Sequence, residues 1–476
     1  MSCTGNEIRG PGSNVIRLFK HYVPTPLLVL GILDYLLLFV SADAAWRVRS
    51  AQIGLDFQPL ADRIPDLGTF TVTMGISMLA VGLYQADSQR SWRMTFTRLA
   101  VAFFIGFNLM SVVFFLFPSV ALWRSIALYA IVFSIGSLLF ARAVFGQIVS
   151  WDRFRRKVIV LGAGGRGAKL HDLALLPGST FSVARFIRMS SAEPVVADPL
   201  SREDMGSLRD VIEHHGAEEV VLAMEERRNS LPVAELLQVK LSGVRVSEMS
   251  TFLERETGRV DLTSVSPSWL IFSDGFLGTQ QLALVFKRGI DIFTSALILV
   301  VTSPILIVTA GLVWATSRGP IFYRQDRIGQ FGKAFAVMKF RSMRIDAERD
   351  GTPVWAQKDD PRITAVGRVI RATRIDEIPQ IFNVLKGDMS FVGPRPERPF
   401  FVTELAVAIP FYNERHVVKP GITGWAQLNY PYGASVDDAR QKLEYDLYYI
   451  KNYSPFLDLL ILVQTVRVIL WRDGVR

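Results

Sequence analysis

The sequence predicts a membrane protein of three parts: an α-helical transmembrane bundle, a small doubly wound α/β module, and a mainly α-helical third domain that is embedded in the membrane through a re-entrant helix. Three observations lead to this prediction. Half of the 476 residues are hydrophobic, and long apolar runs crowd the first third of the chain. Alternating strand and helix patterns follow these runs. A last apolar run has basic residues on both sides and a proline at its centre.

The transmembrane region, residues 1–150, contains four apolar runs of roughly the ~20 residues that a helix needs to cross a bilayer. They are residues 26–40, 67–84, 99–117 and 120–140. Arginine and lysine cluster before the first run, after the second and after the fourth, which places both ends of the bundle in the cytoplasm. No A-x-A site follows the first run, so we interpret it as an anchor. Asp34 inside it is expected to face the bundle or an interface, because a charge in lipid is costly.

The composition excludes several classes of protein. Cys3 is the single cysteine, which excludes an intrachain disulfide and a multi-cysteine metal cluster and fits a reducing compartment. The net charge of +9 is spread over the membrane flanks and the C-terminal third, without a basic tail. We therefore expect attraction to anionic membrane lipid and no nucleic-acid partner.

Residues 151–250 show the pattern of a Rossmann-like cytoplasmic module. The expected strands are residues 157–161, 181–189, 219–224 and 244–249, and the expected helices are 168–176, 203–215 and 233–241. The first strand ends in a G-x-G-x-x-G sequence, residues 162–167, which would let a phosphate approach the next helix. The acid that should bind the ribose is absent near Arg188 and Met189. A structural or regulatory module is favoured, and dinucleotide binding remains the alternative.

Residues 251–285 lack clear periodicity and are interpreted as a linker to the third domain, residues 286–476. This domain opens with the apolar run 292–315, within a predicted re-entrant helix at 290–315. Basic residues on both sides put both of its ends on the cytoplasmic face, so the segment must turn around. Pro304 breaks the helix, and the Ser303 hydroxyl can bond a freed carbonyl. A plain transmembrane helix with a tolerated proline, or a buried soluble helix, are the alternatives.

Four motifs follow the re-entrant helix: MKFRSM at 338–343, IRATRIDEIPQIFNVL at 370–385, SFVGPRPERP at 390–399 and KPGITGWAQ at 419–427. Asp376 and Glu377 are expected to open a helix and to remain ionised in its dipole. Arg371 and Arg374 beside them can clamp phosphate oxygens. An ordinary acidic N-cap is the alternative for the acidic pair alone.

Together these motifs resemble one family. From about residue 286 to the C-terminus the chain resembles the bacterial sugar transferases called monotopic phosphoglycosyl transferases, or polyprenyl-phosphate hexose-1-phosphate transferases. The basic-flanked Ser-Pro helix and the KFRSM, DEIPQ, GPRP and PGITGWAQ segments occur in the family's order, without departure at the catalytic motifs. Four spans before a Rossmann-like module resemble the long form of this family. The stretch SPSWLIFSDGF resembles its exosortase-associated exopolysaccharide branch.

The resemblance implies a ping-pong transfer of hexose 1-phosphate from a UDP-sugar to undecaprenyl phosphate, with release of UMP. This is the initiating step of exopolysaccharide, capsule or O-antigen synthesis. Asp376 would be the nucleophile and Glu377 the ligand of Mg²⁺. Arg395, Lys339 and Arg341 join the two arginines before the dyad as phosphate-binding candidates. The expected place is the bacterial inner membrane, with the catalytic domain on the cytoplasmic face. A homodimer and downstream glycosyltransferases are expected partners.

Two other functions remain open. A membrane-bound nucleotide-sugar dehydratase could also join four spans to a Rossmann unit, but none of the 12 tyrosines is followed by lysine four residues on, as the resemblance to short-chain reductases requires. A noncatalytic scaffold of a polysaccharide assembly complex would not need the Asp376–Glu377 dyad. No motif records which hexose is transferred, and glucose or galactose is the default expectation.

Overall fold

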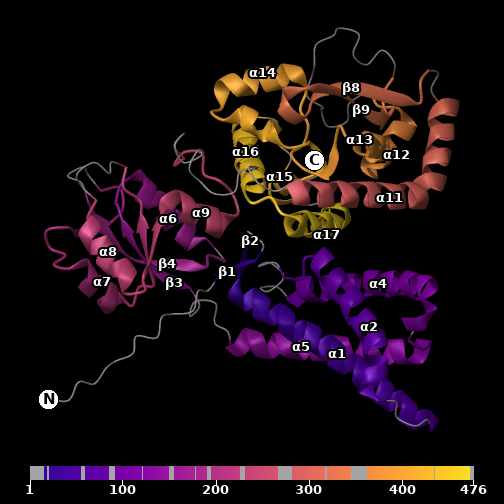
Figure 1. Ribbon diagram of the computed structural model, residues 1–476, viewed down its shortest axis with the longest axis horizontal. Helices are drawn as coiled ribbons and strands as arrows, with labels where there is room; N and C mark the ends of the chain where they lie inside the picture. Colours follow the sequence, from indigo (N-terminus) through magenta and orange to yellow (C-terminus); the bar gives the residue numbers. More distant parts are fainter. Residues whose placement is uncertain are drawn as a thin grey trace. The chain divides into compact units, whose positions relative to one another are not determined.

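The computed structural model describes residues 15–18, 21–54, 59–84, 92–120, 122–148, 155–176, 178–189, 194–225, 231–265, 281–316, 319–344, 362–431, 433 and 435–471. The chain divides into two compact units (Figure 1). The first extends to Gly258, and the second begins at Arg259. Cys3 and the stretch 267–276, which carry two of the sequence predictions, lie outside the described residues.

The first unit begins with two short strands, β1 Val15–Leu18 and β2 His21–Pro24, and the helices α1 Thr25–Ile53, α2 Leu60–Ala80, α4 Trp92–Leu116 and α5 Arg124–Ile148, with a 3₁₀ turn η1 Pro118–Val120. Over the described ranges, four helices are long and apolar enough to cross a membrane: α1, α4, α5 and the later α11. α2 covers the second predicted span but is not among them. It begins earlier than predicted, and its first two turns carry Asp62, Arg63 and Asp66, which lower its mean hydropathy.

Asp34 points into the bundle, as predicted. It is fully buried, and its Oδ2 accepts a hydrogen bond from Arg142 of α5 at 2.7 Å. The hydroxyls of Ser41 and Ser137 lie 3.1 Å apart and connect the same two helices. A charge in lipid is tolerated when it is paired inside the protein, so this ion pair accounts for an acidic residue in α1.

The α/β module contains a five-stranded parallel sheet in the order β5-β4-β3-β6-β7. Its elements are β3 Arg156–Leu161, α6 Gly165–Leu175, β4 Phe181–Arg188, β5 Leu200–Ser201, α7 Leu208–His215, β6 Glu219–Leu222, α8 Val233–Leu241, β7 Arg245–Glu248 and α9 Met249–Thr257. The four predicted strands and three predicted helices are confirmed, with shifted ends. The two-residue β5 is too short to leave a sequence pattern, and α9 begins before the predicted linker and extends into it. Val158 to Leu161 are all fully buried, because helices cover both faces of a parallel sheet.

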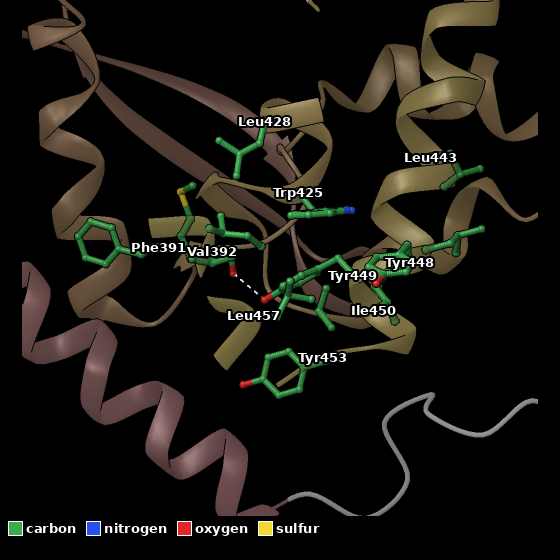
Figure 2. Packing of buried hydrophobic residues seen from close by; sticks show 14 of the residues in the cluster. Phe391, Val392, Trp425, Leu428, Leu443, Tyr448, Tyr449, Ile450, Tyr453 and Leu457 are labelled. Carbon is green, nitrogen blue, oxygen red and sulfur yellow. Dashed lines mark hydrogen bonds between the residues drawn. The ribbon is translucent and has the colours of Figure 1, made fainter. Parts of the chain in front are cut away.

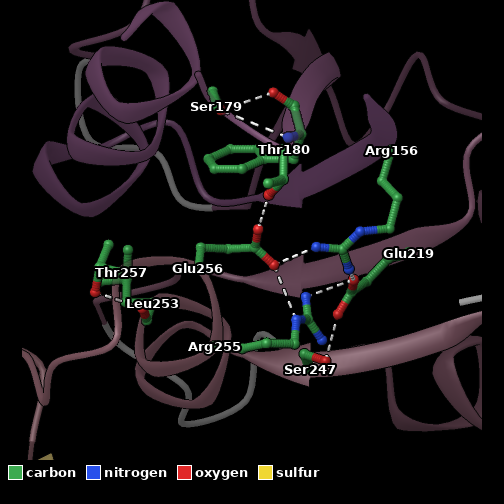
Figure 3. A network of polar contacts seen from close by, with 10 residues as sticks. Arg156, Ser179, Thr180, Glu219, Ser247, Leu253, Arg255, Glu256 and Thr257 are labelled. Atoms are coloured by element: carbon green, nitrogen blue, oxygen red, sulfur yellow. Dashed lines mark hydrogen bonds and ion pairs between the residues drawn. The ribbon is translucent and has the colours of Figure 1, made fainter. Parts of the chain in front are cut away.

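A buried network of charged side chains lies where β3 and β6 begin (Figure 3). Arg156 and Arg255 each donate to Glu219 Oε2 at 2.8 Å. Glu256 accepts from both arginines and from Thr180. The charges alternate in sign, so each buried ion is paired. The network thus ties β3, where the chain enters the module, to α9, where it leaves.

The second unit is built around a long helix and an antiparallel hairpin. Its elements are α11 Gln281–Thr316, β8 Phe322–Ile328, η3 Gln330–Gly332, β9 Ala334–Phe340, α12 Ala365–Ala372, η4 Ile375–Gln380, α13 Ile381–Lys386, β10 Ser390–Val392, α14 Pro399–Ala408, η5 Tyr412–Val417, β11 Gly421–Thr423, α15 Trp425–Asn429, α16 Val436–Lys451 and α17 Pro455–Trp471. β8 pairs with β9, and β10 pairs in parallel with β11.

The core of this unit gathers aromatic and aliphatic side chains from α15, α16 and α17 (Figure 2). Trp425 stacks on Tyr448 with ring centroids 5.9 Å apart. Leu443, Tyr448 and Leu457 are fully buried. The core also includes Val260, which is 1% exposed and whose amide donates to the carbonyl of Glu444 at 3.0 Å. The boundary between the two units therefore falls inside the predicted linker: residues 251–258 belong to the first unit, and the second unit begins at Arg259.

The first half of α11 is pinned to this unit by charged side chains. Arg288 donates to the last carbonyls of α13, those of Val384 and Leu385, at 2.6 Å each. Asp291 is 4% exposed and accepts from the Ser390 hydroxyl at 2.9 Å and from the following amide at 3.0 Å. These bonds satisfy helix-end carbonyls and a strand amide that would otherwise lack partners.

Lys287 adds a further connection, from α11 to α17. Its ammonium group donates to Asp458 at 2.7 Å, to the Val392 carbonyl at 3.0 Å and to the Tyr449 hydroxyl at 3.2 Å. Asp458 and Arg467 of α17 are both buried. These two polar side chains therefore face the protein interior.

The chain stays helical through Pro304, so the predicted interruption is wrong. Pro304 has no amide hydrogen for the carbonyl of Val300, but the Ser303 hydroxyl donates to that carbonyl at 2.8 Å. Figure 1 shows that α11 bends instead of ending. The role predicted for Ser303, to bond a freed carbonyl, is confirmed.

Candidate active site

The Asp376–Glu377 dyad lies on a 3₁₀ turn between α12 and α13. Arg374, the residue directly before this 3₁₀ turn, has a φ of 60°, a left-handed conformation that is uncommon for residues other than glycine. This conformation separates the dyad from α12. The prediction that the two acids open a helix is confirmed, but the first turns are 3₁₀: both acids lie in the first turn of Ile375–Gln380, which continues directly into α13 at Ile381.

Glu377 is surrounded by three cations from separate segments. Its Oε1 lies 2.8 Å from Lys339 Nζ of β9 and 3.2 Å from Arg395 NH2. Its Oε2 lies 3.9 Å from Arg374 NH1. Burial opposes ionisation of Glu377, but Arg395 and Lys339 outweigh it and hold the pKa of Glu377 well below its usual range. The prediction that this carboxylate remains ionised agrees with its surroundings.

Asp376 has different surroundings, although it is the adjacent residue. It is 8% exposed, and among the described residues its Oδ1 has no hydrogen-bond partner. Burial and the charge of Glu377 raise the pKa of Asp376, while Lys339, Arg371 and Arg374 oppose the rise. No donor of the described residues therefore engages the lone pairs of Oδ1. Free lone pairs are what an oxygen needs to act as a nucleophile.

Asn383 of α13 holds the strand that carries Lys339, and the sequence analysis did not single it out. Its Oδ1 accepts from the amide of Met338 at 3.0 Å, and its Nδ2 donates to the carbonyl of Ala336 at 2.8 Å. The amide group thus replaces a neighbouring strand along one edge of β9. A polar residue within the apolar stripe of this helix was the signal that could have identified it.

The Gly-Pro-Arg-Pro and Lys-Pro-Gly motifs interlock through the β10–β11 pair. A Cβ atom at Gly393 would lie 2.3 Å from the carbonyl oxygen of Lys419, and one at Gly421 would lie 2.1 Å from the amide of Gly393. The amide of Gly393 donates to the main-chain carbonyl of Thr423 at 2.9 Å. Backbones can approach this closely only where there are no side chains, which explains why both motifs contain glycine.

The remaining predicted site residues lie at the margins of the dyad. Arg371 is in the last turn of α12, where its charge acts on Asp376. Arg341 is buried just beyond β9 and two residues after Lys339, and its amide donates to the carbonyl of Ile321 at 2.9 Å. Lys339, Arg374 and Arg395 are thus brought onto Glu377, whereas Arg371 and Arg341 lie in the adjoining elements.

The described residues contain no group of three or more histidine, cysteine, aspartate or glutamate side chains that could hold a metal ion. A metal ion at the dyad would therefore need ligands from a substrate and water. Mg²⁺ is commonly bound in this way, through one or two carboxylates and substrate phosphates. The Oε2 of Glu377, which lies 3.9 Å from Arg374 NH1, is compatible with such a site.

Comparison with known proteins identifies the class to which this fold and site belong. Residues 282–472 match the model of the family described as bacterial sugar transferase. The chain is 41% identical over 197 residues to an uncharacterized sugar transferase of Bacillus subtilis and covers 91% of that protein. The chain therefore belongs to the bacterial sugar transferase family.

Two relatives have more specific names. The chain is 44% identical over 241 residues to a UDP-N-acetylgalactosamine-undecaprenyl-phosphate N-acetylgalactosaminephosphotransferase of Aeromonas hydrophila. The matched segment covers 51% of this chain and 56% of the relative. It is 42% identical over 238 residues to a UDP-glucose:undecaprenyl-phosphate glucose-1-phosphate transferase of Klebsiella pneumoniae, or 49% and 50% of the two chains. The match thus spans about half the length of these two relatives.

Proposed function

We propose that the protein transfers a hexose 1-phosphate from a UDP-sugar to undecaprenyl phosphate and releases UMP, as the first step in building a polysaccharide repeat. The observation that carries this proposal is the buried Asp376, with an unengaged carboxylate oxygen, beside a Glu377 that three cations neutralise. The printed names of the Aeromonas and Klebsiella relatives describe the same kind of transfer and support it.

In the proposed reaction Asp376 Oδ1 attacks the β-phosphorus of the UDP-sugar. The bond from that phosphorus to the bridging oxygen breaks, UMP leaves with the electron pair, and an acyl phosphate remains on Asp376. A phosphate oxygen of the lipid then attacks the same phosphorus, and the Asp376 carboxylate leaves. One anhydride is exchanged for another in each step, so covalent catalysis conserves bond energy.

The cations around the dyad have a second role in this proposal. Lys339, Arg374 and Arg395 already face Glu377 and can turn their remaining donors to the diphosphate, as can Arg371 and Arg341 from the adjoining elements. Glu377 would hold Mg²⁺ together with substrate oxygens. When bound, the ion would offset negative charge on the diphosphate.

We also propose that α11 is re-entrant, with both ends at the cytoplasmic face. Its N-terminal half is bonded to the second unit through Lys287, Arg288 and Asp291. Its C-terminal half packs onto the same unit, where Val313 belongs to a buried cluster with Phe340 and Ile370. A helix that crossed the ~30 Å hydrocarbon core would separate its two ends on opposite faces of the membrane. Contacts from both halves to one unit support a bend that returns to the same face.

For the α/β module we propose a structural or regulatory Rossmann-like role. The amide of Gly165, at the start of α6, donates to the Glu225 carboxylate at 3.0 Å. A Cβ atom at Gly164 would lie 2.9 Å from the same carboxylate oxygen. A pyrophosphate would need this amide, so the chain's own acid competes with a dinucleotide. The module also remains our proposed surface for a homodimer.

The inner membrane is the proposed location, with the dyad on the cytoplasmic side where UDP-sugars are made and downstream glycosyltransferases extend the lipid-linked product. The test is UMP release by membranes containing the protein, supplied with undecaprenyl phosphate and a panel of UDP-sugars. We expect release with UDP-glucose, UDP-galactose or their N-acetylated forms. Absence of UMP release with every sugar would favour the noncatalytic scaffold.

A further inference from the structure

Arg415 is a buried arginine that joins three elements of the second unit. It lies in η5 and is 6% exposed. Its NH2 donates to the Asp446 carboxylate of α16 at 2.8 Å and to the main-chain carbonyl of Arg395 at 3.1 Å. Its NH1 donates to the Tyr412 hydroxyl at 2.7 Å. One guanidinium therefore connects a buried acid to the backbone of the Gly-Pro-Arg-Pro loop.

The backbone dihedral angles of that loop are restricted by its two prolines, independently of Arg415. Pro394 and Pro396 have a fixed φ, and a residue that precedes proline is kept out of the α region. The direction of the Arg395 side chain then depends on the orientation of the peptide group that follows it. The bond from Arg415 sets this orientation at the Arg395 carbonyl, while Arg395 NH2 lies 3.2 Å from Glu377 Oε1.

Stability alone is a weak reason to bury such a pair of charges. Transfer of each ion from water costs several kcal/mol, and well-packed apolar residues in place of a buried ion pair are often neutral or stabilising. A guanidinium, however, can bind a carboxylate and a carbonyl together, because its donors form a rigid planar fork. The geometry of the Arg415–Asp446 pair is therefore better explained by what it holds in place.

We propose that Arg415, with Asp446 as its counter-ion, is a positioning residue that directs Arg395 toward Glu377 and the substrate phosphate. This inference rests on the proposed function, in which Arg395 contacts that phosphate. Arg415 itself touches no reacting atom. It acts through the Arg395 carbonyl.

The deciding variant of the full chain is the double substitution Arg415→Met with Asp446→Leu, which leaves no buried charge unpaired. We expect its Tm in detergent to stay close to that of the wild type. Its kcat for UMP release should fall about 100-fold, the scale on which a 1 Å misplacement acts, while KM for the UDP-sugar changes far less. The matched control is Arg440→Gln with Asp437→Asn, an exposed ion pair on α16, which should leave Tm and kcat unchanged.

A double variant with wild-type Tm and wild-type kcat would overturn the proposal. If that variant does not fold, Arg415→Lys decides instead, because lysine keeps a charge beside Asp446 but lacks the fork. Lower kcat at an unchanged Tm supports positioning, and unchanged kcat refutes it. If the wild type releases no UMP, the proposed function has failed. Crystal structures of wild type and double variant then decide, since an unchanged Arg395–Glu377 contact would refute the positioning role without any activity measurement.

Discussion

Lys339 Nζ lies 2.8 Å from Glu377 Oε1, and this contact joins the β8–β9 hairpin to the turn that carries Asp376. Burial lowers the pKa of Lys339, and the charge of Glu377 opposes that change. The acidic partner therefore favours the charged form of the lysine. The Oδ1 of the adjacent Asp376 has no hydrogen-bond partner among the described residues.

The substitution Lys339→Met tests this contact. Loss of the ammonium group leaves Glu377 less neutralised and removes a phosphate-binding donor, so we expect kcat to fall by about 100-fold, as for other removed electrostatic contributors. UMP release measures the effect. Lys333→Met, at an exposed position of the same hairpin, is the control and should retain full activity. Similar rates for both variants would exclude a role of Lys339 in the reaction.

The two carboxylates of the dyad should fail in different ways when they are changed. Asp376→Asn removes the nucleophile, so neither UMP release nor a covalent adduct should form. Glu377→Gln keeps the nucleophile but weakens the electrostatic site, with an expected loss of about 100- to 1000-fold. The measurement is the mass of peptides containing Asp376 after acid quench without lipid acceptor. A sugar-phosphate adduct on another peptide would show that the nucleophile is misassigned.

The bend of α11 predicts that both of its ends are reached from the same side of the membrane. With Cys3 replaced by serine, single cysteines at Gly289 and Thr316, both exposed positions, should be labelled only from the cytoplasmic side. Pro304→Leu restores the missing amide donor and should straighten the helix. We expect it to lower activity by moving the site away from the interface. Labelling of Thr316→Cys from the periplasm in the otherwise unchanged protein would refute the re-entrant proposal.

The α/β module should be dispensable for the chemistry. A truncated protein that starts at Gly258 keeps Val260 in the core, whereas one that starts at Thr279 loses this contact. Both should transfer sugar phosphate, and the longer one should have the higher Tm, because removing a buried aliphatic side chain costs roughly 2–5 kcal/mol. Added NAD should change neither the rate nor the Tm of the full chain. A folded but inactive truncation, together with stimulation of the full chain by NAD, would make the glycine-rich loop functional.

His416 should make the second unit sensitive to acid. Burial and the neighbouring Arg415 lower the pKa of His416 from 6.5 to about 4. Between these values the unfolded chain binds a proton that the folded chain does not, so stability rises with pH. The stabilising contribution is present above pH 6.5 and is lost as the pH falls toward 4. His416→Gln should flatten the dependence of Tm on pH in this window, and identical slopes in wild type and variant would contradict the assignment.

Much of the fold could be predicted because the signals are local. The four predicted strands and three predicted helices of the module are short segments whose patterns lie in neighbouring residues, and all of them form. Membrane spans follow from length and apolarity, although α2 shows that a partly polar helix gives an ambiguous signal. The boundary at Gly258 could not be predicted, because Val260 joins the second unit through contacts with residues far along the chain.

The sequence by itself determined which residues we propose for the chemistry: the Asp376–Glu377 dyad and the cations at 339, 374 and 395 are readable as motifs. Only the tertiary structure decided how the two acids differ, because ion pairing and burial depend on partners that lie 18 to 38 residues away from Glu377. The supporting contacts of Asn383 and the positioning role proposed for Arg415 likewise depend on the tertiary structure. Their side chains act on backbone groups of distant strands and loops, and a linear sequence does not record which backbone groups they meet.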